Sequence, residues 1–220
     1  MKNVVYLILV SLLVFTSCKK DSNLTTPTED SSTVTYSGKV YHTVKIGNQT
    51  WLKENLDVGV MIQDTTCASN NGVIEKYCYG NDTANCTKYG GLYQWDEAMC
   101  YVRSERAQGI CPAGWHIPTK AEFDKLSRAV DYNSNSLIAV GHGTGSGIGT
   151  DSSGFSALLA GCCYGISGFY GFGIATDFWS STEYSVANVY DVNLSGVASR
   201  IYIDHYNTEN GFSVRCIKDE

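Results

Sequence analysis

The first folded stretch of the chain alternates apolar and polar positions with a period of two. Residues 40–46 alternate in this way, Gly47-Asn48 follows, and residues 49–52 would form the returning strand. Asn and Gly suit a two-residue turn between strands, so this pattern predicts a β-hairpin. His42 lies inside the first run, where we expect a packed or surface imidazole rather than a ligand.

The C-terminal third of the chain shows the same period. The runs 190–194 and 197–203 flank a Ser195-Gly196 turn, and a last strand runs over 212–216 and ends in Ile217-Lys218-Asp219. Alternation over this length is typical of half-buried strands. We therefore expect the protein to end in a sheet.

A helix is predicted in the middle of the chain. Thr119 and Glu122 have the spacing of a capping box, and Phe123, Leu126 and Val130 then follow on one helical face. Residues 92–99 also have roughly helical spacing, where we expect a packed aromatic stripe. The glycine-rich run 141–149 lacks both the Lys-Ser/Thr of a P-loop and the GxGxxG spacing, so it is interpreted as a flexible loop.

The N-terminus carries an apolar run from Val4 to Phe15 after Lys2. The run is shorter than the roughly 20 residues of a membrane-spanning helix, so it is interpreted as a secretory signal. It ends in Thr16-Ser17-Cys18, which resembles the lipobox of bacterial lipoproteins. By this resemblance residues 1–17 are removed and Cys18 is acylated as a membrane anchor. The alternative is a plain cleaved signal that leaves Cys18 as an ordinary thiol.

Residues 18–35 follow as a predicted flexible tether, because they are mainly polar and contain almost no apolar side chains. The start Lys19-Lys20-Asp21 is similar in part to signals that send lipoproteins to the outer face of the cell. We therefore expect a protein that is anchored in the outer membrane by its lipid and displayed on the outer face. We expect it to have one folded domain, over residues 36–220.

Composition restricts the partners of this domain. The net charge is −6, and an acidic surface does not attract nucleic acid or anionic lipid heads. Charged residues make up 17% of the chain, below the usual quarter, while 22 Gly and 15 Tyr favour loops, short strands and stacked aromatic rings. The expected partners are the membrane, through the lipid, and a glycan or protein ligand, with no nucleic acid.

The cysteines indicate an oxidising compartment. Besides Cys18 the chain has an even set, which in an exported protein is typical of a disulfide framework. Cys78 and Cys86 bracket a short polar loop, so we expect them to form a disulfide with each other. No spacing of Cys and His typical of zinc, haem or thioredoxin chemistry occurs. No cofactor or metal is therefore expected.

Three positions leave a structural and a functional interpretation open. The adjacent Cys162-Cys163 either pair elsewhere or form a reactive couple, and strain disfavours a ring between neighbours. His116 either supports the turn before the predicted helix or acts as a general base. The aromatic residues Tyr164, Phe169 and Tyr170 lie among glycines, where they either fill the underside of a loop or bind a ligand such as a sugar ring.

Seven short segments, in order along the chain, carry a resemblance to a known family. They are Thr43 to Trp51, Glu54 to Leu56, Tyr89 to Trp95, Cys111 to Thr119, Gly154 to Leu158, Phe178 to Glu183 and Ser213 to Cys216. Together they resemble the Fibrobacter succinogenes major paralogous domain. That family consists of secreted or lipid-anchored surface proteins with no established activity.

The resemblance also implies a fold and a disulfide. The family is similar to C-type-lectin-like folds and to the formylglycine-generating-enzyme group, which implies an α+β domain of mainly antiparallel strands with one or two helices, long loops and disulfide bracing. In such folds a cysteine near a helix bonds one in the last strand, which implies a Cys111–Cys216 pair. The pairing of the four other cysteines stays open: Cys67, Cys100, Cys162 and Cys163.

Departures from these relatives decide between two functions. No proline follows Pro118, and the comparable tryptophan begins Trp179-Ser180-Ser181, so the calcium–sugar site of the lectins is not supported. The adjacent Cys162-Cys163 do not reproduce the spaced copper-binding cysteines of the generating enzymes. We therefore expect a non-catalytic binding, adhesion or scaffold module. The alternative is an enzyme of the same fold that uses a reactive cysteine.

Overall fold

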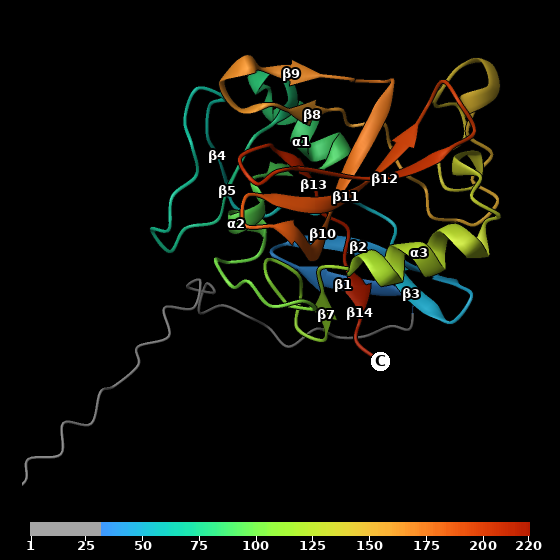
Figure 1. Ribbon diagram of the computed structural model, residues 1–220, viewed down its shortest axis with the longest axis horizontal. Coiled ribbons are helices and arrows are strands. Elements are labelled where there is room, and N and C mark those ends of the chain that lie inside the picture. Colours follow the sequence, from blue (N-terminus) through green and yellow to red (C-terminus); the bar gives the residue numbers. More distant parts are fainter. Residues whose placement is uncertain (1–31) are drawn as a thin grey trace, which may run out of the picture.

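Strands from the two ends of the chain share one sheet (Figure 1). The computed structural model describes residues 32–220; the predicted signal peptide 1–17, the lipidation site Cys18 and most of the predicted tether lie outside the described residues. The first sheet has the order β1-β2-β3-β14-β7. Its strands are β1 (Thr33–Tyr36), β2 (Lys39–Ile46), β3 (Gln49–Leu52), β14 (Ile217–Lys218) and β7 (Trp115–His116).

The predicted N-terminal hairpin is confirmed. Strand β2 pairs antiparallel with β3, and Ile46 lies opposite Gln49, so Gly47-Asn48 forms the turn. The predicted tether boundary is different in the structure. Strand β1 begins inside residues 18–35, at Thr33, pairs along its length with β2, and buries Val34. The folded part therefore includes residues 33–35, because an apolar residue flanked by threonines is enough to add an edge strand.

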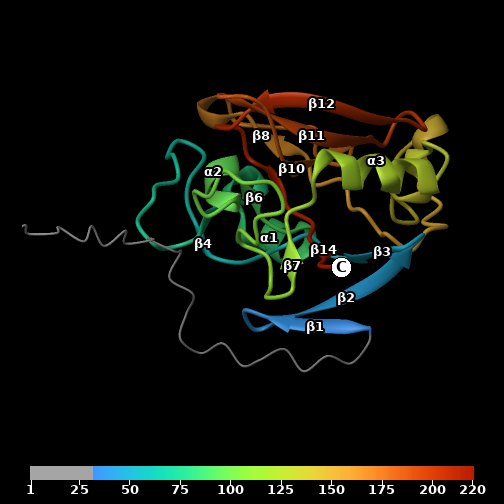
Figure 2. The same cartoon turned by 60° about the horizontal axis from the view of Figure 1, so that its bottom comes forward.

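The second sheet lies opposite the first, as Figure 2 shows. Its order is β12-β11-β10-β13-β6. Its strands are β12 (Ile201–Asn207), β11 (Asn188–Ser195), β10 (Ala175–Ser185), β13 (Phe212–Ser213) and β6 (Leu92–Tyr93). All neighbours are antiparallel except β10 and β13, which are parallel.

The chain crosses between the two sheets near its C-terminus. The run 212–217, predicted as one strand, is split into β13 in the second sheet and β14 in the first. Residues 214–216 connect them, held by backbone hydrogen bonds from Leu56 to Val214 and from Leu52 to Cys216. The prediction of a single strand was wrong because alternation does not say which sheet each half joins.

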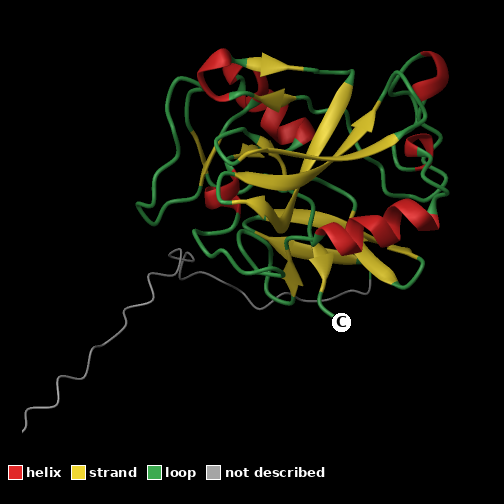
Figure 3. Ribbon diagram, in the orientation of Figure 1, coloured by secondary structure: helices red, strands yellow, loops and turns green. Residues whose placement is uncertain are grey.

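Within residues 32–220 the sheets are accompanied by three α-helices (Figure 3), of which α3 packs against β10 and β11. Helix α3 (Lys120–Ala129) begins at the predicted capping box: the Thr119 side chain accepts from the Glu122 backbone N–H, and the Glu122 carboxylate accepts from the Thr119 N–H. Helix α1 (Thr83–Tyr89) starts inside the segment between Cys78 and Cys86 that was predicted as a plain loop. Helix α2 (Trp95–Ala98) is shorter than the helical spacing of 92–99 suggested.

The remaining elements are short. They are β4 (Val60–Met61), β5 (Glu75–Lys76), β8 (Cys162–Cys163), β9 (Phe169–Tyr170), η1 (Tyr79–Asn81), η2 (Ser134–Ser136), η3 (Gly145–Gly147) and η4 (Gly165–Ser167). The glycine-rich run 141–149 contains η3 and passes so close to the backbone of Gly196 and Val197 that a Cβ on Gly147 would clash. Within residues 32–220, no helix has the length and apolarity to span a membrane.

In the described part of the chain, two disulfides brace this α+β architecture. Cys78 bonds Cys86, and Cys111 bonds Cys216 across 105 residues of sequence; both are the pairs expected from the sequence analysis. The second bond links the loop before β7 to the crossing segment between the sheets. That segment is thereby held on one side by a covalent bond and on the other by backbone hydrogen bonds.

Candidate functional site

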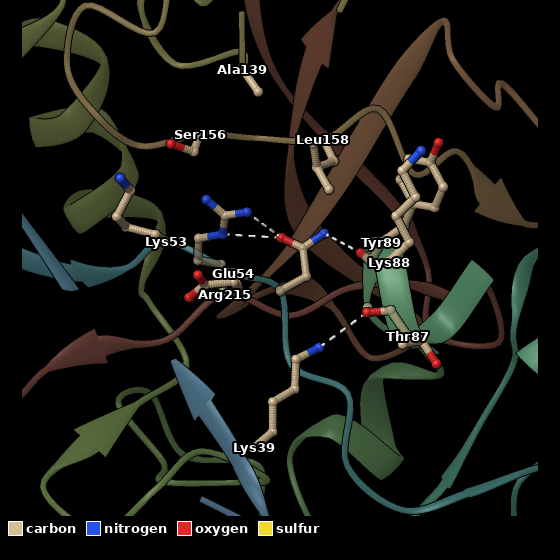
Figure 4. Close-up of a pocket in the computed structure, with 12 residues that line it drawn as sticks. Lys39, Lys53, Glu54, Thr87, Lys88, Tyr89, Ala139, Ser156, Leu158 and Arg215 are labelled. Carbon is tan, nitrogen blue, oxygen red and sulfur yellow. Dashed lines mark hydrogen bonds between the residues drawn. The ribbon is translucent and has the colours of Figure 1, made fainter. Parts of the chain in front are cut away.

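A cleft of about 320 Å³ lies beside the crossing segment (Figure 4). It is lined by the start of β2, the residues that follow β3, the C-terminal end of α1, the loop 139–158 and Arg215. Figure 4 shows Lys53 and Glu54 on one side of Arg215 and residues 87–89 on the other. Segments distant in the sequence therefore meet around a single arginine.

Arg215 is 1% exposed although it carries a guanidinium. Its Nε–H donates to Asn55 Oδ1 at 3.0 Å, one Nη donates to the same oxygen, and the other Nη donates to the carbonyl of Phe155. The guanidinium also lies 4.4 Å from the ring centroid of Phe155 and 5.3 Å from that of Phe178. Amide oxygens and aromatic faces thus contact the guanidinium directly, while the Glu54 and Asp151 carboxylates act on its charge from farther away and form no ion pair with it among residues 32–220.

Burial lowers the pKa of Arg215 to about 9, because a low-dielectric environment disfavours the charged form. The group is still protonated at neutral pH. A guanidinium has five N–H donors, and three of them are used in the hydrogen bonds to Asn55 and Phe155. Two donors of a buried cation therefore have no acceptor in the described part of the chain.

Asn55 holds Arg215 in this position. Its Nδ2 donates to the Tyr89 carbonyl at 2.9 Å and to Ser213 Oγ at 3.2 Å, which leaves Oδ1 for the guanidinium. Gly90 allows this approach: it has a φ of +85°, and a Cβ there would lie 2.5 Å from the Asn55 Cβ. The end of α1 and the crossing segment are joined through one amide side chain.

Lysines surround the mouth of the cleft. Lys53 and Lys88 form no ion pair with residues 32–220, and the Lys88 ammonium lies 5.0 Å from the ring centroid of Tyr89. Lys39 Nζ lies 3.7 Å from Asp57 Oδ2. The one acidic residue in the lining, Glu54, accepts from the backbone N–H of His42 and contacts its ring Nδ1 at 2.7 Å. The cleft is thus cationic in an acidic protein.

Two further buried ionisable side chains lie in the other sheet. Asp177 on β10 is 5% exposed and accepts from Asn193 Nδ2 at 2.7 Å. Asp191 on β11 is fully buried; no N–H or O–H donor in residues 32–220 reaches its carboxylate oxygens, and its hydrogen-bond partner, when it is protonated, is the Asp177 carboxylate. Burial raises the pKa of Asp177 to about 6 and that of Asp191, next to Asp177 and Asp204, to about 8.

The adjacent cysteines are buried thiols. Cys162 Sγ lies 3.7 Å from the Tyr170 carbonyl, and Cys163 Sγ lies 3.6 Å from that of Gly165. Burial raises the pKa of both thiols to about 12. Cys67, by contrast, is exposed and forms no disulfide within residues 32–220. Because the thiolate is the nucleophile, Cys162 and Cys163 are held in their unreactive form.

The predicted aromatic binding residues are gathered only in part: the Tyr164 and Tyr170 rings lie 5.5 Å apart, whereas Phe169 packs on Tyr79. The Tyr164 ring packs 6.0 Å from Tyr206 and 6.3 Å from Phe212, and the Phe169 ring packs 5.1 Å from Tyr79. Tyr170 is 49% exposed. Two of the three therefore fill the underside of the loop, and Tyr170 is left as the accessible ring.

His116 supports the start of α3. It is 1% exposed; its Nδ1 contacts Asp219 Oδ1 at 2.6 Å and its Nε2 lies 3.1 Å from both oxygens of Glu122. Arg106 Nη1 donates to the same Glu122 carboxylate at 2.6 Å. Burial raises the pKa of Glu122, but the hydrogen bonds and charge of His116 and the hydrogen bonds from Thr119 outweigh it and lower the pKa to about 2. The imidazole thus links the capping box to the C-terminus.

Sequence reasoning assigned no role to Arg215 or Asn55, although both lie in the segments that carry the family resemblance. A signal was present: Arg215 is the only charged residue in the otherwise apolar and small run 211–217. A charged side chain in such a run is either exposed to solvent or buried with specific hydrogen-bond partners. Among residues 32–220, no three His, Cys, Asp or Glu side chains are grouped to hold a metal ion.

Comparison with known proteins adds one finding. The sequence model of one protein family, the Fibrobacter succinogenes major domain, matches residues 44–218, a range that includes both Asn55 and Arg215. None of the curated proteins and none of the solved structures matches the chain.

Proposed function

The chain belongs to the Fibrobacter succinogenes major domain family, and from that premise we propose that it is a non-catalytic module that binds a glycan or protein ligand at the cell envelope. The observation that carries the proposal is the cleft beside Arg215, where a buried cation keeps two N–H donors without an acceptor in residues 32–220. Binding sites are typically concave and contain a few convergent polar groups. Such a module serves in adhesion or as a scaffold.

The enzyme alternative, with Cys162 or Cys163 as nucleophile, has less support, because burial keeps both thiols protonated. Intact-mass analysis after treatment with iodoacetamide under native, non-reducing conditions tests it. We expect no stoichiometric label at Cys162 or Cys163 and full labelling after denaturation, with exposed Cys67 as the internal positive control. Rapid native labelling of either buried thiol would favour the enzyme.

We also propose that acylated Cys18 anchors the protein in the outer membrane and that the tether displays the domain outward. The support is the apolar run that ends in Thr16-Ser17-Cys18. Protease treatment of intact cells is expected to release the domain, and mass spectrometry is expected to find an acylated N-terminal peptide. The Cys18→Ala variant should lose the acyl group. An acyl-free N-terminus in the wild-type protein would refute the anchor.

A further part of the proposal is a C-type-lectin-like fold. It is supported by the bond between Cys111, which lies before α3, and Cys216, which lies next to the last strand. The arrangement of a long irregular segment between α3 and β10 also fits such a fold. An experimental structure compared by superposition with lectin domains tests this point, and a different strand connectivity would reject it.

The binding proposal is tested with the mature chain without its acyl group. Glycan arrays and titrations against cell-envelope fractions should reveal a saturable ligand. Lys53→Gln and Tyr170→Ala separate the two accessible faces: a ligand in the cleft is weakened by the first variant, and a ligand on the aromatic loop by the second. If all titrations are negative while circular dichroism shows folded protein, the binding function is refuted.

A further inference from the structure

We propose that the cleft beside Arg215 is an oxyanion site, which takes a carboxylate, phosphate or sulfate group carried by a compact ligand. This inference rests on the proposed binding function and specifies its ligand class. Nothing in the family match assigns a ligand to these residues. Three independent features of the cleft carry the inference: the buried donors, the surrounding charge and the size.

The first feature is the set of free donors on a buried cation. Arg215 is 1% exposed and lines the cleft, yet its hydrogen bonds go only to the neutral oxygens of Asn55 and Phe155. Buried charges are normally paired or fully hydrogen-bonded, because desolvation of an ion is expensive. Glu54 and Asp151 act on this cation without an ion pair to it, so a bound oxyanion would place a counter-charge in direct contact and accept from the two remaining N–H groups. The planar guanidinium matches oxyanion geometry well.

The second feature is the sign of the local charge. Lys39, Lys53, Lys88 and Arg215 line the cleft together with one carboxylate, that of Glu54. Glu54 is engaged by His42, while Lys53 and Lys88 have no acidic partner in the described residues. The chain as a whole has a net charge of −6. Clefts lined by one sign of charge concentrate ligands of the opposite sign.

The third feature is the size and rigidity of the cleft. A volume of about 320 Å³ lies at the small end of ligand pockets, so the ligand, or the part that enters, is about as large as one sugar acid. Asn55 is fixed by the Tyr89 carbonyl and by Ser213, and the adjacent Cys216 is bonded to Cys111. Arg215 is thus held in place before any ligand arrives, which reduces the entropy lost on binding.

The test uses the full chain purified in detergent and isothermal titration at constant ionic strength. The probes are sodium glucuronate, glucose as its neutral counterpart, inorganic phosphate and sodium sulfate. We expect saturable binding of at least one oxyanion and none of glucose. Glucuronate binding without phosphate or sulfate binding would identify the source as a sugar acid; the reverse would identify a phosphate- or sulfate-bearing ligand.

Two double variants locate the site. Lys53→Gln with Lys88→Gln removes two charges at the cleft and is expected to weaken oxyanion binding about tenfold. Lys45→Gln with Lys125→Gln removes the same charge from exposed positions outside the lining and should leave binding unchanged. All four lysine side chains are at least partly exposed, so we expect both double variants to fold.

The side-chain Nε–H resonance of Arg215 gives an independent readout, and it should shift on saturation with the oxyanion. The inference is overturned if no oxyanion binds the folded wild-type protein, or if both double variants weaken binding equally. A saturable neutral glycan or protein ligand that ignores the lysine variants would overturn the oxyanion site while leaving the proposed binding function intact.

Discussion

Arg215 and Asp191 are both buried ionisable side chains without an ionic partner in residues 32–220, but they respond to burial in different ways. Desolvation lowers the pKa of Arg215 from 12.5 to about 9, which leaves it charged at pH 7. Desolvation raises the pKa of Asp191 from 3.8 to about 8, which makes it mostly neutral at the same pH. The distance of the reference pKa from neutrality decides which group keeps its charge.

The two side chains also lie in different surroundings. Arg215 lies at a cleft, and its position is set by Asn55 and by the disulfide at the next residue. Asp191 lies within the second sheet, opposite Trp179 and hydrogen-bonded, when protonated, to the Asp177 carboxylate, with no N–H donor to its oxygens in residues 32–220. The first arrangement preserves a charge at the lining of a cleft; the second removes a charge inside a sheet.

The largest expected effect concerns the covalent support of Arg215. Replacement of Cys111 and Cys216 by serine should lower the free energy of unfolding by about 5 kcal/mol, because the bond closes a loop of 105 residues. Replacement of Cys78 and Cys86, whose separation is 8 residues, should cost about half as much. Urea denaturation measures both. Equal losses would mean that loop entropy does not govern the support of the crossing segment.

Removal of the cation itself should have the next largest effect. Arg215→Met fills a similar volume but leaves the Asn55 and Phe155 oxygens without their donor, so we expect a loss of about 3 kcal/mol. Arg200→Met, at an exposed position, is the matched control and should change stability by less than about 0.5 kcal/mol. An Arg215→Met protein as stable as the wild type would show that the buried guanidinium contributes nothing to the fold.

Asp191 is expected to destabilise the folded protein when it ionises, whereas the Arg215 side chain is expected to stabilise it. Its folded pKa is raised, so the native state keeps a proton that the unfolded chain releases near pH 4, and stability should fall as the pH rises from about 4 to about 8. Asp177, with a pKa of about 6, adds to this trend below pH 6. Asp191→Asn is expected to flatten the slope and to stabilise the protein by roughly 1–2 kcal/mol at pH 8.

The control for this measurement is Asp204→Asn, because Asp204 lies opposite Asp191 on the exposed edge strand. It should reduce the slope only slightly. An Asp191→Asn protein that keeps the full slope above pH 4 would contradict a proton on Asp191.

Glu122 affects stability in a separate pH range: its pKa is lowered to about 2, so the stability it contributes is lost between about pH 4.5 and pH 2.

The smallest effect on stability is expected at the mouth of the cleft. Lys53→Gln should change the free energy of unfolding by less than about 0.5 kcal/mol, because the lysine forms no ion pair with the described residues. Ligand binding should weaken in the same variant. A large loss of stability would mean that Lys53 supports the fold, which would remove it from the candidate site.

The parts of the fold predicted correctly depend on residues close in sequence. The hairpin follows from Gly47-Asn48 and its flanking alternation, and α3 follows from the Thr119–Glu122 capping box. The predictions that failed concern the choice of partner strand. Residues 212–217 alternate like one strand, yet they divide between two sheets. Strand β1 was missed because Val34 becomes a core residue only when β2 is beside it.

The candidate site also has features set by the local sequence and features set by the fold. The sequence by itself determined the signal-like N-terminus, the acidic composition, the capped helix and the cysteines available for bracing, because these depend on local pattern and residue type. Only the tertiary structure decided that Arg215 is buried next to Asn55 while Asp191 is buried next to Asp177. The physical reason is that desolvation and charge depend on neighbours, and those neighbours are up to 160 residues away along the chain.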